Sequence, residues 1–122
     1  MTAPKSIAHE FGKSGEEAAA RYLKNKKFRI IERNFRFLKG EIDIIAYDKE
    51  TLVFIEVKAR KSQEFGPPEE SVTPSKQRQI KRVAQGFLVK NNLKDVQCRF
   101  DVLSLSFHEK NGYQIHHLQN AF

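Results

Sequence analysis

Three charged residues lie inside the two most strand-like stretches of the sequence, where buried, uncharged side chains are expected. Asp43 belongs to the stretch Glu41–Tyr47, and Glu56 and Lys58 belong to Leu52–Ala59; both stretches are rich in β-branched and aromatic residues. A carboxylate on the covered face of a sheet is costly unless it has a partner. These three residues are therefore the first candidates for chemistry.

A hairpin between the two stretches would bring the carboxylates together. If its turn is centred between residues 49 and 50, Asp43 faces Glu56 and Glu41 faces Lys58. Opposed carboxylates about 5 Å apart repel each other, and Mg²⁺ binds one or two carboxylates while it keeps several waters. We therefore expect a divalent metal at this pair, with Lys58 beside a metal-bound water or a phosphoryl group. The alternative is a solvated strand face on which Glu41 and Lys58 form an ordinary ion pair.

Glu16 is a third carboxylate that the pattern directs toward the sheet. Ser14 followed by Glu17 has the form of a capping box, which predicts a helix that begins here and ends near Asn25; the residues before Ser14 either add a turn or fray. Glu16 lies on the same side of this helix as Leu23, in the apolar stripe, whereas capping accounts for Glu17. The alternative for Glu16 is a favourable interaction with the dipole at the helix N-terminus.

A second helix is predicted from Pro74, with Thr73 as its N-cap, to about Asn91. Its apolar residues repeat at helical spacing: Ile80, Val83, Ala84, Phe87 and Leu88. Lys76 falls close to this stripe, so we expect the first turn to lean over the sheet. Three basic residues point away from the stripe: Arg78, Lys81 and Arg82. They form either a solvated face or a ridge that contacts phosphates, and periodicity does not distinguish the two.

The order of the predicted elements indicates the fold class. Five stretches have strand character: Phe28–Phe37, Glu41–Tyr47, Leu52–Ala59, Val96–Phe107 and Tyr113–Leu118. With the two helices, the order α-β-β-β-α-β-β predicts an α/β fold in which a mixed β-sheet is flanked by α-helices. Residues 61–72 are polar and contain Gly66-Pro67-Pro68, which predicts a long loop. The length and position of this loop suggest the hypothesis that it contacts a substrate or closes over it.

Length and charge limit the class of protein. The chain has 122 residues, with 22 Lys and Arg against 15 Asp and Glu, so its formal net charge is +7. We expect a single domain over residues 1–122. No apolar run approaches the roughly 20 residues that span a bilayer, and the N-terminus lacks the apolar stretch of a signal peptide. We therefore expect a cytoplasmic protein with no membrane partner, and the positive excess favours nucleic acid as the partner.

The cysteine and histidine residues lack the spacing that a disulfide or a histidine metal site needs. The single Cys98 excludes an internal disulfide, and its alternation with Phe100 predicts a small core residue. His116 and His117 are adjacent in a predicted strand, so they point to opposite faces and do not chelate one ion. Asp101 lies in another predicted strand, where we expect it to form a structural ion pair or hydrogen bond.

A helix that carries Glu, a strand that ends in Asp and a strand that bears Glu-x-Lys together resemble the PD-(D/E)xK nuclease superfamily. The closer similarity is to the YraN family of predicted bacterial endonucleases, which is similar to archaeal Holliday junction resolvases. The motifs that carry it cover nearly the whole chain: Gly15–Ala19, Arg33-Asn34, Gly40–Ile45, Val53–Arg60, Lys76, Arg99–Val102 and Asn120–Phe122. The proline that precedes the aspartate in the superfamily is Ile42 here.

The resemblance implies a restriction-endonuclease-like core and a metal-dependent DNA endonuclease that acts with Mg²⁺ or Mn²⁺ on branched DNA or on repair and recombination intermediates. It implies Asp43, Glu56 and Glu16 as metal ligands, Lys58 as the catalytic lysine, and Lys76 as an auxiliary basic residue. Junction resolvases act as dimers, which makes a homodimer a further expectation, although the sequence shows no strong interface signature.

Two alternatives stay open beside the endonuclease. The first is a nucleic-acid-binding module of the same fold that has little catalysis and acts with a partner. The second is a structural or interaction protein whose acidic site only binds an ion.

Overall fold

The structure is a computed structural model that describes the backbone of residues 4–61 and 72–122, with the side chains from residue 13 onward in these ranges. There the chain forms the predicted series of elements: α1 (Pro4–Asn25), β1 (Arg29–Phe37), β2 (Gly40–Asp48), β3 (Thr51–Arg60), α2 (Pro74–Lys90), β4 (Cys98–His108) and β5 (Gly112–Leu118). The predicted α/β class and element order are confirmed. The predicted loop over residues 61–72 lies almost entirely outside the described residues.

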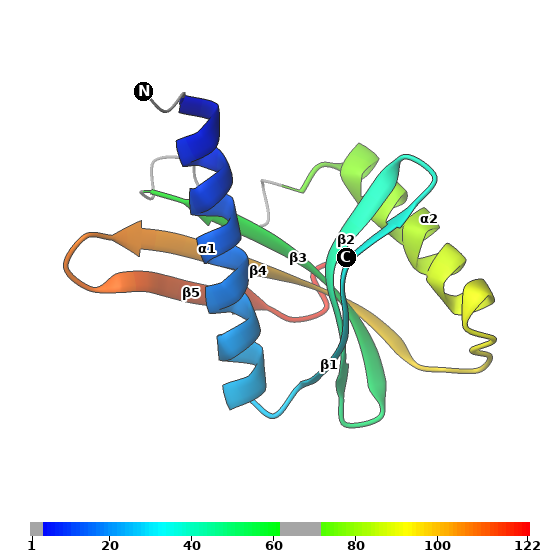
Figure 1. Cartoon of the computed structure of the whole chain (residues 1–122). Coiled ribbons are helices and arrows are strands. Elements are labelled where there is room, and N and C mark those ends of the chain that lie inside the picture. Colours follow the sequence, from blue (N-terminus) through cyan, green and yellow to red (C-terminus); the bar gives the residue numbers. More distant parts are fainter. Residues whose placement is uncertain (1–3, 62–71) are drawn as a thin grey trace.

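The strands form one mixed sheet in the order β1-β2-β3-β4-β5. β3 and β4 are parallel and are connected through α2, whereas the other neighbouring strands are antiparallel. Figure 1 shows α1 crossing one side of the sheet over β4 and β5, with α2 beside β2 at the other end. A mixed sheet flanked by helices is what the sequence predicts, and it is consistent with a restriction-endonuclease-like core.

The central strand β3 is covered on both faces, one by each helix. Leu52 and Phe54 belong to the hydrophobic cluster of α2, and Val53 and Ile55 belong to the cluster of α1. Alternate residues of a strand point to opposite faces, so the two helices cover opposite faces of the sheet. This burial accounts for the unbroken apolar run of β3.

The alternation of β2 breaks at Asp43. Ile42 packs in the cluster of α2, and Ile44 packs in the cluster of α1. Residues two apart on a regular strand share a face, so the placement of these two isoleucines on opposite faces marks an irregularity in β2. Asn34 of β1 lies across from Asp43 and has a φ of 55°, a conformation that Asn tolerates better than most residues. The regular alternation of side chains between the two faces is thus interrupted in both strands at the position of Asp43.

The first helix is longer than its predicted capping box allows. It begins at Pro4, so Ser14 lies inside the helix and is not the N-cap. The hydroxyl of Ser14 accepts a hydrogen bond from Tyr113 at 3.3 Å. Glu17 forms an ion pair with Arg33, with 3.2 Å between its Oε2 and the Nη2 of the arginine. Proline is well tolerated in a first turn, and these two side chains serve tertiary contacts in place of capping.

The second helix matches its prediction. Thr73 is the N-cap and its Oγ1 accepts a hydrogen bond from the backbone N–H of Lys76 at 3.1 Å. Pro74 follows as the first helical residue, and Asn91 is the C-cap. Four residues of the predicted stripe are buried, and Leu88 packs against them.

Two glycines let α2 lie close to the hairpin of β1 and β2. A methyl group on Gly40 would lie 2.5 Å from Cγ2 of Val83, and one on Gly86 would lie 2.5 Å from the ring of Phe37. Neither contact is sterically acceptable, so both positions require glycine at this spacing. The second half of α2 therefore approaches the hairpin closely.

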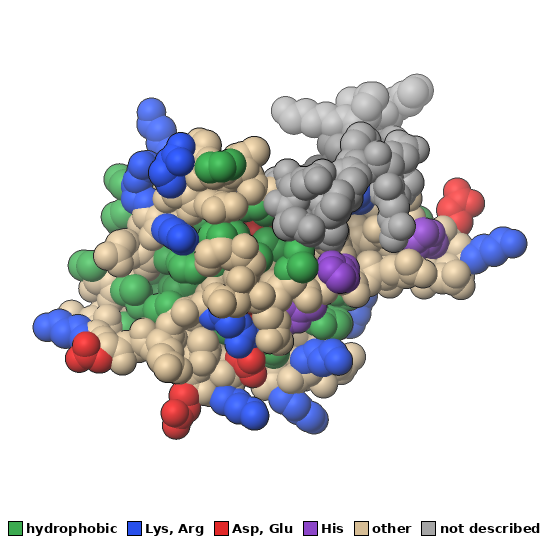
Figure 2. Space-filling view, turned by 180° about the vertical axis from the view of Figure 1, so that it is seen from behind, with side chains coloured by type: hydrophobic (Ala, Val, Ile, Leu, Met, Phe, Trp, Pro, Cys, Tyr) green, Lys and Arg blue, Asp and Glu red, His purple; other side chains and the backbone are tan. Residues whose placement is uncertain are grey.

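Hydrophobic side chains remain at the surface around α2. Figure 2 shows them beside Lys and Arg side chains at the α2 end of the molecule. Phe37, Leu38 and Val89 are exposed. Cys98 is exposed as well, so its prediction as a core residue is wrong: it is the first residue of β4, where the sheet is not covered. No helix within the described ranges is long and apolar enough to cross a bilayer.

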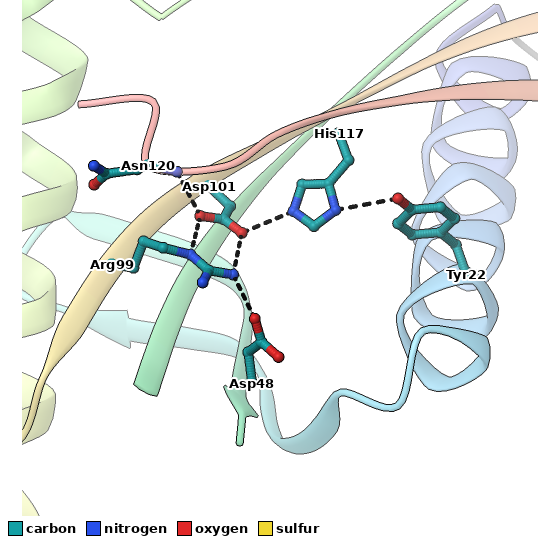
Figure 3. A network of polar contacts seen from close by, with 6 residues as sticks. All are labelled: Tyr22, Asp48, Arg99, Asp101, His117 and Asn120. Carbon is teal, nitrogen blue, oxygen red and sulfur yellow. Dashed lines mark hydrogen bonds and ion pairs between the residues drawn. The ribbon is translucent and has the colours of Figure 1, made fainter. Parts of the chain in front are cut away.

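A polar network around the fully buried Asp101 joins α1, β2, β4 and the C-terminal segment (Figure 3). Arg99 donates to both carboxylate oxygens, at 2.9 and 3.0 Å, and also lies 3.1 Å from Asp48. Nε2 of His117 lies 2.7 Å from Asp101, and the backbone N–H of Asn120 donates to it at 3.0 Å. The predicted structural role of Asp101 is confirmed.

The network compensates the charge of Asp101. Burial alone would raise the pKa of this carboxyl, but the hydrogen bonds from His117 and Arg99 outweigh it and lower the pKa below 3.8. The ionised form is therefore the stable one in the fold. Tyr22 extends the network, with its hydroxyl 3.2 Å from Nδ1 of His117, and links it to α1.

We predict that Asp101→Asn lowers the free energy of unfolding at neutral pH by about 3 kcal/mol, because Arg99 loses its buried counter-charge. Asp48→Asn, at the more exposed end of the network, is the matched control and should cost less than about 1 kcal/mol. Urea denaturation measures both. Since the pKa of Asp101 is depressed, its stabilisation is complete above 3.8 and is lost as the pH falls further. Equal losses in the two variants would contradict the central role of Asp101.

Candidate functional site

The site begins where the ladder between β2 and β3 ends. The strands pair from Asp48 and Thr51 to Ile44 and Ile55, which confirms the predicted register over this stretch. The next residues of the two strands, Asp43 and Glu56, are not partners in the ladder, although the predicted register places them opposite each other. Instead, Oδ2 of Asp43 accepts a hydrogen bond from the backbone N–H of Val57 at 2.8 Å.

Glu56 lies next to this point with two lysines on its carboxylate. Its side chain is 7% exposed, and its Oε2 lies 3.4 Å from Nζ of Lys58 and 3.8 Å from Nζ of Lys76. Two cations offset the cost of burying the charge. Lys58 thus shares a face with Glu56, and the first turn of α2 leans over the sheet, as the sequence predicts.

The ordinary ion pair that was the alternative for this strand face is not formed. Glu41 lies on β2 opposite Arg36 of β1, and its Oε1 is 3.6 Å from Nε of that arginine. Lys58 is directed to Glu56 instead. Charge at this end of β3 is therefore gathered around a buried carboxylate.

Asp43 is a half-buried carboxylate that lies among negative charges. Its pKa is raised from 3.8 to about 7, first by burial and then by the negative charge of Glu56. The hydrogen bond from the N–H of Val57 acts in the opposite direction, and the charges of Glu16 and Glu41 raise the pKa further. Near neutral pH this carboxyl is therefore divided between its two protonation states.

Glu16 reaches the site through the close packing of α1 on β3. A methyl group on Gly15, the residue before it, would lie 2.8 Å from Cβ of Ala59, so glycine allows the helix to come this near. Because α1 begins at Pro4, about three turns upstream, the dipole of the helix N-terminus does not account for Glu16, since that effect is confined to the first turn. Glu16 is half-buried, and its charge acts on Asp43.

The donor set fits a divalent cation of the magnesium type. Carboxylate oxygens are its preferred ligands, and one or two of them with waters are sufficient. A dication bound here would lower the pKa of Asp43 and so oppose the effect of the neighbouring negative charges. In the described part of the chain, however, no three His, Cys, Asp or Glu side chains are grouped as ligands of one ion. Glu56 has the largest electrostatic effect on Asp43 of the neighbouring carboxylates, and the roles of Asp43, Glu56 and Glu16 as metal ligands stay predictions.

Two contacts of the site were not predicted from the sequence. The N–H of Val57 reaches Asp43 because β2 and β3 separate there, and no residue pattern signals that separation. The close approach of Gly15 has a signal only once α1 is known to begin at Pro4, because a glycine inside a helix costs about 1 kcal/mol relative to alanine. Such a glycine indicates a packing reason.

The basic residues on the outer side of α2 are only partly explained. Arg78, Lys81 and Arg82 are exposed, as predicted. Nζ of Lys81 lies 5.7 Å from the ring centre of Phe100 and 5.8 Å from that of Phe122, which are stacked on each other. Lys81 therefore covers an aromatic pair, and the phosphate-binding ridge stays a prediction for the other two.

The chain is similar to a family of bacterial proteins over most of its length. The family model described as "Uncharacterised protein family UPF0102" matches residues 15–105, a range that contains all five candidate site residues. A UPF0102 protein of Geobacter sulfurreducens is 46% identical over 91% of this chain and 87% of its own length. A UPF0102 protein of Chlorobaculum tepidum is 48% identical over 100% of this chain and 95% of its own length.

We predict that Asp43→Asn stabilises the metal-free protein at neutral pH. The folded state binds the proton of Asp43 more tightly than the unfolded state, so stability falls as the pH rises from 3.8 to about 7. A shift of this size corresponds to up to about 4 kcal/mol. Urea denaturation in EDTA should show an advantage of the variant that grows over this range and is constant above it. Glu50→Gln, an exposed turn carboxylate, is the control; an advantage independent of pH would contradict the prediction.

We predict that Gly15→Ala destabilises the protein, although alanine favours a helix by about 1 kcal/mol. The added methyl group meets Ala59, and overpacking costs about 1–3 kcal/mol. Ala59→Gly removes the opposing methyl group and should restore stability in the double variant. A double-mutant cycle by urea denaturation measures this coupling, and additive effects would show that α1 does not depend on the contact.

Proposed function

The chain belongs to the UPF0102 family, and from its candidate site we propose that it is a metal-dependent DNA endonuclease that hydrolyses phosphodiester bonds. One observation carries the proposal: the buried Glu56 has Lys58 at 3.4 Å, and Asp43 lies beside it with a pKa raised by burial and by the negative charge of Glu56. A structural role would favour compensated carboxylates. A site for a dication and a phosphate requires this excess of oxygen ligands next to a lysine.

Asp43 and Glu56 would hold Mg²⁺ or Mn²⁺, with Glu16 on the helix beside them. When bound, such an ion polarises a phosphoryl oxygen and activates a water. The chain fixes the two carboxylates before substrate arrives: Asp43 by the N–H of Val57 and Glu56 by its lysines. Ligands that are already oriented lose little conformational freedom on binding.

The two lysines supply positive charge for the phosphate. The side chains of Lys58 and Lys76 are 36% and 35% exposed, so a polyanion can reach both. Each ammonium group can turn from Oε2 of Glu56 to a phosphoryl oxygen without leaving the site. Lys58, from the same strand as Glu56, orients the attacking water or stabilises the charge that develops in the transition state, and Lys76 assists from α2.

DNA would be held by its backbone. The net charge of +7 favours association with phosphates, and such binding weakens steeply as the salt concentration rises. The resemblance to junction resolvases supports branched DNA and recombination intermediates as substrates and a homodimer as the active form.

A second function is a nucleic-acid-binding module that keeps the fold but cuts poorly and acts with a partner. One observation favours it: within the described residues no group of three metal ligands is formed, and Glu56 is engaged by two lysines. In that case the basic surface would bind DNA while the carboxylates served to position the lysines.

We predict cleavage of branched DNA that requires Mg²⁺ or Mn²⁺ and is abolished by EDTA. Asp43→Ala and Lys58→Ala should each lower the rate by at least about 100-fold, because they remove a metal ligand and a charge that acts in the transition state. Glu16→Gln should have a smaller effect. Lys94→Ala, an exposed lysine outside the site, is the matched control. Gel assays with branched, single-stranded and duplex DNA measure these rates.

Metal binding is measured separately by the loss of the electron paramagnetic resonance signal of free Mn²⁺. The wild type should bind Mn²⁺ and Asp43→Asn should not. Binding of Mn²⁺ and DNA without cleavage would support the second function. Absence of DNA binding at low salt would contradict both functions and leave an ion-binding structural protein.

A further inference from the structure

A groove lies on the outer side of α2, where its last two turns meet the β1–β2 turn. It has a volume of about 340 Å³ and is lined by Phe37, Arg82, Gln85, Gly86, Val89 and Lys90. None of these residues belongs to the candidate site, and the sequence patterns do not explain the exposed apolar ones. This volume is at the lower end of the range for ligand pockets, which suits one or two side chains.

The groove is built by the close approach of the hairpin to the helix. Gly86 allows the ring of Phe37 to lie against α2, and that ring remains 37% exposed. Val89 is 76% exposed, although it lies on the same helix as the buried stripe. Leu38, at the tip of the hairpin, is 71% exposed. Large apolar side chains concentrated at one place on a basic surface mark an interaction site.

The rim of the groove carries one sign of charge. Arg82 and Lys90 stand on it, and none of the residues that line it is acidic. Nζ of Lys90 lies 5.6 Å from the ring centre of Phe35, and this contact holds the ammonium group near the groove. An occupant that fits therefore presents an apolar side chain to the floor and carboxylates to the rim.

We infer that this groove binds an acidic segment of a partner protein, in which aspartate or glutamate residues flank one or two large apolar side chains. The apolar side chains pack between Phe37 and Val89, and the carboxylates pair with Arg82 and Lys90. A second copy of this chain is a poorer occupant, because each copy carries a net charge of +7 and an identical basic rim. A nucleic acid would neutralise the rim but leave the apolar walls in water.

The groove and the candidate site can be occupied together. Lys76, at the start of α2, and Val89, near its end, are about 20 Å apart along the helix axis at 1.5 Å per residue. A bound peptide therefore leaves the carboxylates open. The inference does not rest on the proposed function and holds for a nuclease or for a binding module. It gives the protein a means of being recruited by a partner that is itself acidic.

The test uses a fluorescein-labelled peptide of repeated Asp-Leu-Asp-Phe units and fluorescence anisotropy with the full chain. We expect a dissociation constant on the order of 10–100 µM, as for a few anchored side chains. Two control peptides have Ser in place of Leu and Phe, or Lys in place of Asp, and neither should bind. Val89→Asp should weaken binding at least about tenfold, because it places a like charge in the apolar floor. Arg82→Glu should weaken it at least about fivefold.

Arg78→Glu is the matched control variant, since it reverses the same charge on α2 outside the groove and should leave affinity within about twofold. All three substituted residues are exposed, and circular dichroism checks that each variant folds. Equal binding of the serine peptide, or equal affinity of Arg82→Glu and Arg78→Glu, would overturn the inference. So would self-association in sedimentation velocity that Val89→Asp abolishes, because a second copy would then occupy the groove.

Discussion

The backbone N–H of Val57 donates its hydrogen bond to the carboxylate of Asp43, at the point where the ladder between β2 and β3 ends. The candidate site depends on this hydrogen bond, in which a side-chain carboxylate takes the place of a backbone carbonyl. It satisfies the backbone of β3 while the strands separate, and it holds Asp43 beside Glu56 without placing the two carboxylates in direct opposition. Asn34 across the sheet accommodates the change of face in β2. A regular hairpin would instead force two like charges together.

Two aspartates of this fold, the fully buried Asp101 and the half-buried Asp43, show how the surroundings of a carboxylate decide between a structural and a chemical role. Burial acts on both in the same direction, but Asp101 receives hydrogen bonds from Arg99, His117 and a backbone N–H, and its pKa is lowered. Asp43 receives one backbone hydrogen bond among negative neighbours, and its pKa is raised to about 7. Asp101 joins elements of the fold, and its charge is compensated by its partners. Asp43 is only partly ionised near neutral pH, and a positive charge beside it would favour its carboxylate form, which is a property of a binding site.

Much of the architecture could be predicted because it is encoded locally. Helical and strand periodicities, the Thr73 cap and the β2–β3 turn depend on residues close together in the chain. They predicted the elements, their order, and the register of β2 and β3 as far as Ile44 and Ile55. The predictions were wrong where contacts with distant segments of the chain determine the position or burial of a residue. Ser14 resembles an N-cap but lies within a helix, and Cys98 alternates with apolar residues but begins a strand at an uncovered edge. Local patterns do not report what packs against them.

The sequence by itself determined the fold class, the face that Glu56 and Lys58 share, and the candidacy of their carboxylate and ammonium groups, since a period of two along a strand fixes which side chains lie together. Only the tertiary structure decided the electrostatics of the site. Lys76 comes from a helix that follows β3 in the chain, and the charge of Glu16 acts from the opposite helix. The pKa of Asp43 depends on burial and on these distant charges, and both exist only after the chain has folded.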